Sequence, residues 1–289
     1  MPELPEVEVL RRTLEPRLLG ARIRDVEVRD GRLREPVNAA ALSRAARGRR
    51  VLALRRRSKY LLVDLEGGHT LVLHLGMSGR VTVVPRREPL APHEHVVFRL
   101  AGGERLRFVD PRRFGLVLAV PTEALEADPH FTALGVEPLV EEGEVREPAA
   151  AAAAAPVLSG ELLRAAARGR RGPVKPFLMD ARVVVGVGNI YASEALFEAG
   201  IDPRRSVARI GPARWERLAA AVRTVLARAI AQGGTTLNDF VDGEGNAGYF
   251  QVSLAVYDRE GEPCPRCGGT IRRLVQAGRS TYSCPRCQR

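Results

Sequence analysis

The spacing of apolar residues divides the chain into a helical start, a strand-rich block and a helix-rich block. Residues 1–20 place Val7, Leu10 and Leu14 at helical spacing along one face, which predicts an amphipathic helix. From residue 21 to residue 120, short apolar segments are separated by Gly, Pro and Asp, which is typical of strands. The predicted strands are 23–29, 49–55, 60–65, 70–75, 80–84, 95–100, 105–110 and 115–120, with a weak helix at 39–46.

The second half of the chain predicts helices, and a change of composition separates it from the first half. Residues 141–148 are acidic, and the alanine run Ala149–Ala155 follows before Pro156. The helices expected after this boundary are 159–168, 189–199, 212–231 and a short one near Leu237. The chain is therefore predicted to be an α+β protein. Its expected parts are an N-terminal helix with a two-sheet β-sandwich or barrel (1–140), a linker (141–156), a helical domain (157–257) and a C-terminal segment (258–289).

The charge of the chain indicates a polyanionic partner. Its 45 Lys and Arg residues exceed its 34 Asp and Glu residues, which gives a formal net charge of +11. A charge of this size favours binding to nucleic acid. The alternative is an arginine-rich composition in which the basic side chains are merely solvated. No apolar stretch approaches the length that spans a membrane, so no membrane partner is expected.

Lysine is so scarce in this chain that its positions carry information. Only Lys59 and Lys175 among the 45 basic residues are lysine, so arginine is used wherever charge alone is enough. Lysine can lose its proton when its surroundings lower its pKa, whereas arginine cannot. Lys59, in the basic segment 55–60, is therefore a candidate for proton transfer or for a role that needs compact geometry. The alternative is that Lys59 is a lysine retained by chance at the edge of a basic strand, without a specific role.

The cysteines have the spacing of a structural metal site. Cys264, Cys267, Cys284 and Cys287 are the only cysteines, in the pattern C-x2-C-x16-C-x2-C. Two such pairs can direct four thiolates at one ion, as in tetrahedral zinc sites. Disulfides are the alternative, but a chain without a signal peptide is expected in the cytosol, where thiols stay reduced. The prediction is one structural Zn²⁺.

The first six residues, Met-Pro-Glu-Leu-Pro-Glu, permit two interpretations. If Met1 is removed, Pro2 presents a secondary amine, which titrates near neutrality and can attack a sugar carbon to form an iminium. Glu3 would then be an acid beside the amine, and Glu6 would orient either group. The alternative is an ordinary helix start, because proline and acidic residues favour the first turn of a helix.

Several separated motifs together resemble the formamidopyrimidine-DNA glycosylase family, bacterial bifunctional enzymes that remove oxidised purines from DNA. In chain order the motifs are MPELPEVEV, RRSKYLL, HLGMSGR, DPRRFG, KPFLMD, VVGVGNIYASEALF, QGGTTL and the cysteine segment. They run essentially from end to end, and the alanine tract 149–155 is the visible departure. The resemblance implies that the helical domain holds a helix–two-turns–helix motif and that residues 258–289 form a zinc-ribbon β-hairpin.

The resemblance also implies catalytic roles. Pro2 is expected to attack C1′ of the damaged nucleoside and form a Schiff base, with Glu3 as the acid and Glu6 in support. Lys59 matches the lysine assigned to the elimination steps, and Arg279 matches the arginine at the tip of the zinc hairpin. Because arginine is a poor proton donor, Arg279 is interpreted as a phosphate clamp that assists δ-elimination.

A set of further residues is expected to bind DNA. A base must leave the duplex before chemistry can reach it, and Met77, Arg112 and Phe114 match the wedge that fills the gap. Core packing is the alternative for Met77 and Phe114, and Arg113 is interpreted only as an ambiguous neighbour that can bind a carboxylate. The remaining expected DNA contacts are His93, Arg170, Asn189 as the N-cap of a helix, and Lys175 near the lesion pocket; residues 232–251 are expected to close over the flipped base.

The predicted function is a DNA repair glycosylase and abasic-site lyase that excises 8-oxoguanine and formamidopyrimidines and cleaves the strand by β,δ-elimination. Its expected partner is double-stranded DNA with oxidised bases or abasic sites, and it is expected to act as a monomer in the bacterial cytoplasm. Two alternatives stay open. One is an endonuclease VIII-like glycosylase for oxidised pyrimidines, and the other is a non-catalytic zinc-ribbon protein that binds damaged DNA.

Overall fold

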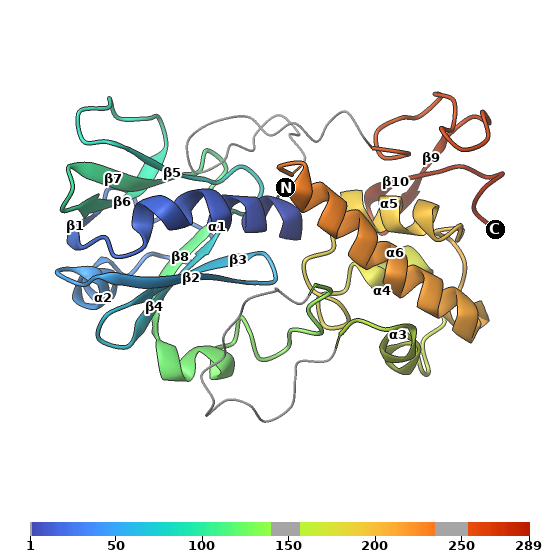
Figure 1. The fold of residues 1–289 in the computed structure, drawn as a ribbon, viewed down its shortest axis with the longest axis horizontal. Coiled ribbons are helices and arrows are strands. Elements are labelled where there is room, and N and C mark those ends of the chain that lie inside the picture. Colours follow the sequence, from blue (N-terminus) through green and yellow to red (C-terminus); the bar gives the residue numbers. More distant parts are fainter. Residues whose placement is uncertain (1, 140–156, 235–253) are drawn as a thin grey trace. The chain divides into compact units, whose positions relative to one another are not determined.

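The computed structural model describes residues 2–139, 157–234 and 254–289 and has the predicted α+β class (Figure 1). These residues form two compact units, one of residues 2–132 with 232–234 and the other of residues 133–139, 157–231 and 254–289. The predicted linker and the short helix near Leu237 lie outside the described residues. Within the described residues, no helix combines the length and the apolar character needed to cross a membrane.

Two antiparallel sheets form most of the first unit, and every predicted strand is found in them. The first sheet has the order β1 (Ile23–Val28), β6 (Glu94–Leu100), β7 (Glu104–Val109) and β5 (Arg80–Pro85). The second has the order β2 (Val51–Arg57), β3 (Tyr60–Leu65), β4 (His69–His74) and β8 (Leu116–Pro121). The short helix α2 (Ala39–Ala46) forms where the sequence predicts it, and the 3₁₀ helix η1 (Thr122–Ala127) follows β8.

The helix α1 (Leu4–Leu18) packs between the two sheets and supplies the centre of their shared core (Figure 1). Leu10 and Leu14 on its apolar face have no exposed surface. They join side chains of both sheets, such as Leu61 and Phe98, in one hydrophobic cluster. Burial of this kind, rather than intrinsic helix propensity, is what stabilises most protein helices. The start of α1 is therefore fixed by the core of the unit.

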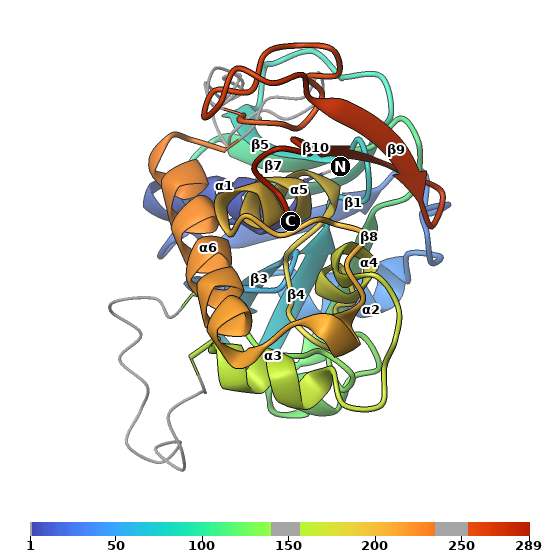
Figure 2. The same ribbon diagram turned by 90° about the vertical axis from the view of Figure 1, so that its right-hand side faces the viewer.

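Helices dominate the second unit. They are α3 (Gly160–Ala166), α4 (Val174–Leu178), α5 (Asn189–Glu198), the 3₁₀ helix η3 (Val207–Arg209) and α6 (Pro212–Ala231). Figure 2 shows α6, which packs against α3 and α5. A side chain at Gly160 would place its Cβ 2.4 Å from the backbone of Glu216, so α3 and α6 can cross this closely only at a glycine.

The short helix α4 is the one α-helix among the described residues that the sequence pattern did not predict. It has five residues and contains Pro176, so it offers too few positions for a helical period. A zinc-ribbon hairpin, β9 (Arg272–Gln276) paired with β10 (Arg279–Ser283), lies near the C-terminus. It packs through Tyr282 and Ile271 against Phe197 of α5.

Candidate functional site

The N-terminal residues form a reciprocal capping box at the start of α1. Glu3 is the N-cap, its side chain accepts from the backbone of Glu6, and the Glu6 carboxylate accepts from the Glu3 N–H at 2.7 Å. Both side chains are almost fully buried, and Pro2, which immediately precedes the N-cap, is buried too. The helix-start interpretation is therefore correct for these residues. It does not exclude the catalytic one, because the same bonds hold residue 2 beside two carboxylates.

A buried ion pair connects α1 to the turn that carries Lys59. The Nε of Arg56 lies 3.3 Å from the carboxylate of Glu8, and both side chains are nearly inaccessible to solvent. The same guanidinium donates to the carbonyl of Ser58 at 3.1 Å. Ser58 has a φ of 57°, a conformation that costs a non-glycine residue energy and needs such support. The sequence interpretation missed Glu8 and Arg56, because their pairing spans 48 residues.

Met77 and Phe114 are exposed to solvent, so the core-packing alternative is wrong for both. Their exposed fractions are 36% and 48%, whereas apolar residues of this size are usually buried. They lie on adjacent loops, 75–79 between β4 and β5 and 110–115 between β7 and β8. The Arg112 guanidinium lies 5.1 Å from the centre of the Phe114 ring, within range of a cation–π contact. The fold therefore brings the three predicted wedge residues together.

The neighbours of this group have separate roles. Arg113 forms an ion pair with Asp30 at 2.6 Å, which confirms that it binds a carboxylate. His93 is exposed, with a φ of 61°, at the residue before β6. His74, at the end of β4, accepts a hydrogen bond at Nδ1 from the Gly76 N–H at 3.0 Å. Because Nδ1 accepts here, the ring is in its neutral Nε2–H form when it supports the Met77 loop.

In the second unit, Lys175 is buried and connects two of the predicted DNA-binding elements. Its ammonium lies 2.6 Å from Asn189 Oδ1, 2.9 Å from Thr281 Oγ1 and 3.0 Å from the Ser280 carbonyl. These acceptors match the three N–H donors of an ammonium. Lys175 therefore joins the first residue of α5 to β10, directly beside Arg279.

Asn189 is not the N-cap of α5, and that prediction is wrong. The cap is Gly188, in an extended conformation, and Asn189 is the first helical residue. The Asn189 side chain is bonded to Lys175 and to the Tyr257 hydroxyl, at 3.5 Å, instead of to the helix backbone. A glycine at this cap leaves the backbone N–H groups of the helix start less screened by side-chain atoms.

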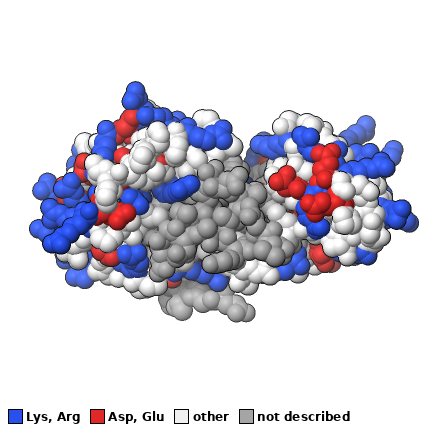
Figure 3. Space-filling model, turned by 90° about the horizontal axis from the view of Figure 1, so that it is seen from above, with Lys and Arg blue, Asp and Glu red and all other residues white. Residues whose placement is uncertain are grey.

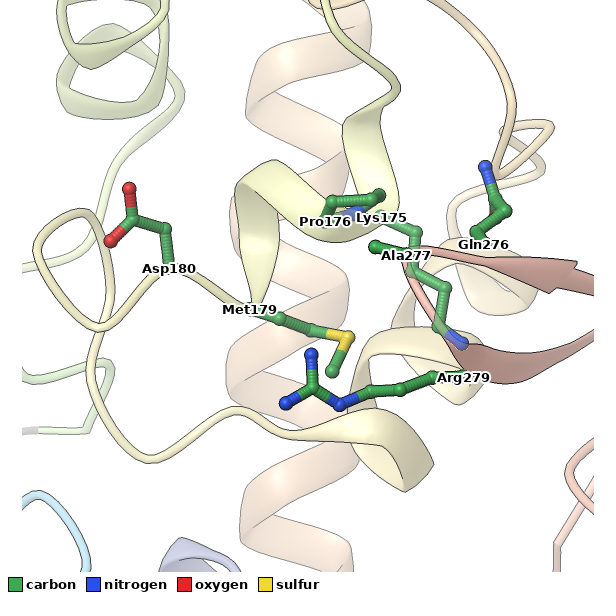
Figure 4. A pocket seen from close by; sticks show the side chains of 7 residues that line it. All are labelled: Lys175, Pro176, Met179, Asp180, Gln276, Ala277 and Arg279. Carbon is green, nitrogen blue, oxygen red and sulfur yellow. The ribbon is translucent and has the colours of Figure 1, made fainter.

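Arg279 begins β10, directly after a tight turn. Ala277 and Gly278 have φ values of 46° and 72°, which is typical of a two-residue hairpin turn with positive φ at both positions. The exposed Arg279 side chain reaches back toward Met179, beside a small hollow that Lys175 also lines (Figure 4).

Arg170 lies in the same unit and forms an ion pair with Asp180 at 3.0 Å. Hydrogen bonds from Arg182 and Arg170 lower the pKa of Asp180 to about 2. The carboxylate is therefore charged at neutral pH and holds both guanidinium groups. Arg170 also lies 5.4 Å from the centre of the Phe177 ring.

The four cysteines form a cluster that fits a zinc ion. Their Sγ atoms all lie within 4.8 Å of one another, with Cys264–Cys287 at 3.8 Å and Cys267–Cys284 at 3.5 Å. Zinc–sulfur bonds of about 2.3 Å in a tetrahedron require sulfur–sulfur distances of about 3.8 Å. Burial and the neighbouring thiols raise the pKa of Cys287 to about 12, so four thiolates this close together would repel one another. The positive charge of a Zn²⁺ ion offsets this repulsion. The site holds a structural zinc, which ties both ends of the β9–β10 hairpin together.

Three family models match the chain in order. They describe the formamidopyrimidine-DNA glycosylase N-terminal domain (residues 1–117), the H2TH domain of the same enzymes (134–241) and the zinc finger found in FPG and IleRS (261–289). Formamidopyrimidine-DNA glycosylases of Acidithiobacillus ferrooxidans and Dechloromonas aromatica are 51% and 48% identical to it over the full length of both chains.

Solved structures agree with these matches. The MutM (FPG) protein of Thermus thermophilus is 42% identical, with a TM-score of 0.83 over 99% of this chain and 98% of that one. Lactococcus lactis Fpg in complex with abasic-site DNA is 30% identical, with a TM-score of 0.87 over 99% of both chains. The fold and the site thus define a zinc-containing enzyme of DNA repair. The chain belongs to the formamidopyrimidine-DNA glycosylase family, a family of glycosylase and abasic-site lyase enzymes.

Protonation of His74 should destabilise the first unit in mild acid. Burial lowers the pKa of His74 to about 4, against about 6.5 in the unfolded chain. The folded state then binds fewer protons between these values, so its stability is complete above pH 6.5 and falls as the pH approaches 4, by up to about 3 kcal/mol. His74→Asn keeps an acceptor for the Gly76 N–H but cannot titrate.

Urea unfolding at pH 7 and at pH 4.5 would measure this effect. The loss of stability on acidification should be smaller in His74→Asn than in the unsubstituted protein. His69→Asn, at the other end of β4, is the matched control for the loss of one histidine. Equal acid losses in all three proteins would remove His74 from this role.

Removal of zinc should unfold the hairpin and leave the first unit intact, because the thiolates belong only to the second unit. A chelator should release one Zn²⁺ per chain, as measured with a chromogenic dye, and amide hydrogen exchange should accelerate in β9 and β10. Exchange in β3 and β4 should not change. Full protection of β10 without metal would show that zinc is dispensable for the hairpin.

Proposed function

We propose that this enzyme is a bifunctional glycosylase and abasic-site lyase that excises oxidised purines, such as 8-oxoguanine and formamidopyrimidines, from duplex DNA. The observation that carries the proposal is the capping box of α1. It fixes residue 2 at the helix start beside the buried carboxylates of Glu3 and Glu6. Once Met1 is removed, the nitrogen of Pro2 becomes a secondary amine that is part of a rigid element rather than of a loose terminus.

The chemistry then follows from the neutral amine. The Pro2 nitrogen attacks C1′, the glycosidic bond breaks, and the base leaves with its electron pair and takes up a proton. Glu3 protonates the ring oxygen O4′ as the sugar opens, which gives an iminium between Pro2 and C1′. The iminium withdraws electrons, so a base can remove a C2′ proton, after which the C3′–O bond breaks and the 3′ phosphate leaves. Loss of a C4′ proton to a base then breaks the C5′–O bond and expels the 5′ phosphate. Water then releases the sugar fragment and restores Pro2.

Lys59 and Arg279 are proposed for the elimination steps. The turn that carries Lys59 is supported by the Arg56 hydrogen bond to Ser58, so a flexible side chain is presented from a defined backbone. Arg279 is proposed to bind the phosphate beside the lesion, because a guanidinium can give two parallel hydrogen bonds to phosphate oxygens. Zinc and Lys175 act indirectly here, since they hold the hairpin that carries Arg279.

The exposed group of Met77, Arg112 and Phe114 is proposed to enter the duplex when the damaged nucleotide leaves it. Exposing apolar side chains to water is unfavourable, and stacking on the bases that flank a gap would bury them. The Arg112 guanidinium can then read the unpaired cytosine. The Arg112–Phe114 contact keeps the cation and the apolar plug together before DNA is bound.

The other predicted contacts are proposed to bind DNA phosphates. They are His93, Arg170 and Asn189, with Lys175 as the residue that orients the Asn189 side chain. Lys and Arg side chains are spread over the visible surface of both units, which supports a polyanionic partner (Figure 3). We also propose that the protein acts as a monomer in the cytoplasm, on double-stranded DNA with oxidised bases or abasic sites. We propose the same domain limits that the sequence predicts: 1–140, 141–156, 157–257 and 258–289.

A second candidate substrate is oxidised pyrimidine. One solved structure of Lactococcus lactis Fpg, at 30% identity and with a TM-score of 0.86, is a complex with DNA that contains an oxidised pyrimidine. Another is a complex with DNA that contains Fapy-dG. A relative in the family therefore forms complexes with DNA of both lesion classes, and the preference of this enzyme is a separate question.

Replacement of Pro2 should abolish covalent chemistry more than DNA binding. With Pro2→Gly, borohydride trapping on an abasic-site duplex should fall strongly, because the secondary amine is lost, while the affinity for the duplex should change little. Pro5→Ala, at the second residue of the same helix, controls for effects on the helix start and should trap normally. Equal trapping by Pro2→Gly and the unsubstituted protein, or a protein that retains Met1 and is fully active, would contradict the proposal.

Substrate preference can be measured on matched duplexes. We expect single-turnover excision of 8-oxoguanine opposite cytosine to exceed that of an oxidised pyrimidine in the same sequence context. The reverse order would favour the endonuclease VIII-like alternative, and no excision of either base would reject the glycosylase function.

A further inference from the structure

Asp110 is a fully buried carboxylate that connects the two loops of the proposed wedge. Its Oδ1 accepts from the Ser78 hydroxyl at 2.8 Å, and its Oδ2 accepts from the Gly115 N–H at 2.7 Å. The Arg112 N–H lies 3.3 Å from both Oδ1 and Ser78 Oγ. One side chain thus bonds to the residue after Met77, to Arg112 itself and to the residue after Phe114.

The two loops also touch each other so closely that glycine is required at the contact. A Cβ on Gly76 would lie 2.4 Å from the backbone of Phe114, and Gly76 has a φ of 60°. A Cβ on Gly115 would lie 2.5 Å from the Phe108 ring and 3.0 Å from Asp110 Oδ2. The two loops are therefore in direct backbone contact at Gly76, in addition to the hydrogen bonds between them.

The backbone of Asp110 reaches the fourth predicted DNA contact of this unit. Its N–H donates to the carbonyl of His93 at 3.0 Å, and its own carbonyl lies 2.8 Å from His95 Nε2. A carbonyl can only accept, so His95 donates from Nε2. Through its main chain, Asp110 thus fixes the strained residue His93, and through its side chain it fixes the wedge.

A comparison with three similar segments shows why the burial of Asp110 matters. In Asp30-x-Arg32, Asp180-x-Arg182 and Asp202-x-Arg204, the arginine pairs with the aspartate two residues before it. The segment Asp110-x-Arg112 has the same spacing, but no such ion pair occurs there among the described residues. The Asp110 carboxylate is already occupied inside the protein, so the Arg112 guanidinium lies over Phe114 instead.

We propose that Asp110 is the positioning residue of the DNA wedge: it joins the Met77 loop to the Arg112–Phe114 loop and keeps the Arg112 guanidinium available for DNA. The inference rests on the proposed function, in which these side chains replace the everted nucleotide. Asp110 itself does not touch the reacting atoms. Its effect is therefore confined to steps in which the duplex must be opened.

A carboxylate is required because all the groups around it are donors. In Asp110→Asn, either orientation of the amide turns its NH₂ toward the Gly115 N–H or toward the Arg112 N–H, so one backbone donor loses its acceptor. Ser78→Ala removes the two hydrogen bonds that the Ser78 hydroxyl makes to the other loop, one to Asp110 Oδ1 and one from the Arg112 N–H, and leaves the carboxylate in place. A hydrogen bond to a charged group is worth roughly a factor of 10 to 100 in an equilibrium constant.

The test compares duplex and single-stranded substrates. We expect Asp110→Asn and Ser78→Ala to slow single-turnover excision from an 8-oxoguanine duplex by roughly 10- to 100-fold. The slower step should also appear in stopped-flow fluorescence of 2-aminopurine next to the lesion, which reports base eversion. Borohydride trapping on a single-stranded abasic oligonucleotide needs no wedge and should change by less than about 3-fold.

Asp64→Asn is the matched control. Asp64 in β3 accepts from Thr70 Oγ1 at 2.7 Å and from Arg55, and it touches neither wedge loop. Its substitution should leave eversion unchanged. If Ser78→Ala and Asp110→Asn slow both substrates equally, or slow neither, the positioning role is overturned. If the unsubstituted protein forms no trapped complex with either substrate, the proposed function fails instead, so the two failures are distinguishable.

Discussion

A charged group that leaves water on folding must find hydrogen-bond partners, because an unmet buried charge costs several kcal/mol. In this protein many of those partners are main-chain atoms of the loops that carry the candidate site. Glu6 accepts from the N–H of Glu3, and Asp110 accepts from the N–H of Gly115. Lys175 donates to the carbonyl of Ser280. The buried charged groups therefore fix the backbone of these loops, and the loop backbone in turn positions the exposed side chains of the candidate site.

The same constraint explains the uneven use of lysine and arginine. Arginine serves well in surface ion pairs, as at Arg182 and Arg204, where a planar fork meets one carboxylate. The acceptors around Lys175 belong to three different residues on two elements, and a compact ammonium can direct one proton to each. A guanidinium is larger and planar, so it would not fit this arrangement. The scarcity of lysine in the sequence thus indicated, at Lys175, a position that requires a compact ammonium group.

Buried acids also stabilise connections outside the proposed site. Glu194 of α5 accepts from the N–H groups of Ala255, Val256 and Tyr257 at 2.8–2.9 Å. These residues lead into the zinc hairpin, so one carboxylate attaches that segment to α5. The four cysteines flank the hairpin on both sides, so zinc joins its two ends. Hydrogen bonds to Glu194 therefore hold the segment that leads into the hairpin, and zinc holds the two ends of the hairpin that carries Arg279.

The sequence by itself determined the features that local spacing encodes. Short apolar segments separated by Gly, Pro and Asp predicted all eight strands of the first unit, helical spacing predicted α1, and the cysteine spacing predicted the zinc site. Local spacing failed where an element was too short, as in α4, and where a side chain had a distant partner, as at Asn189.

Only the tertiary structure decided which polar groups are buried and which apolar ones are exposed. Asp110 meets a hydroxyl 32 residues away, and Lys175 meets one 106 residues away. Such contacts depend on how strands and helices pack, and a short stretch of neighbouring residues holds no information about that packing. The exposure of Met77 and Phe114 follows from the same cause: the two loops meet back to back at Gly76, and their apolar tips are left in solvent.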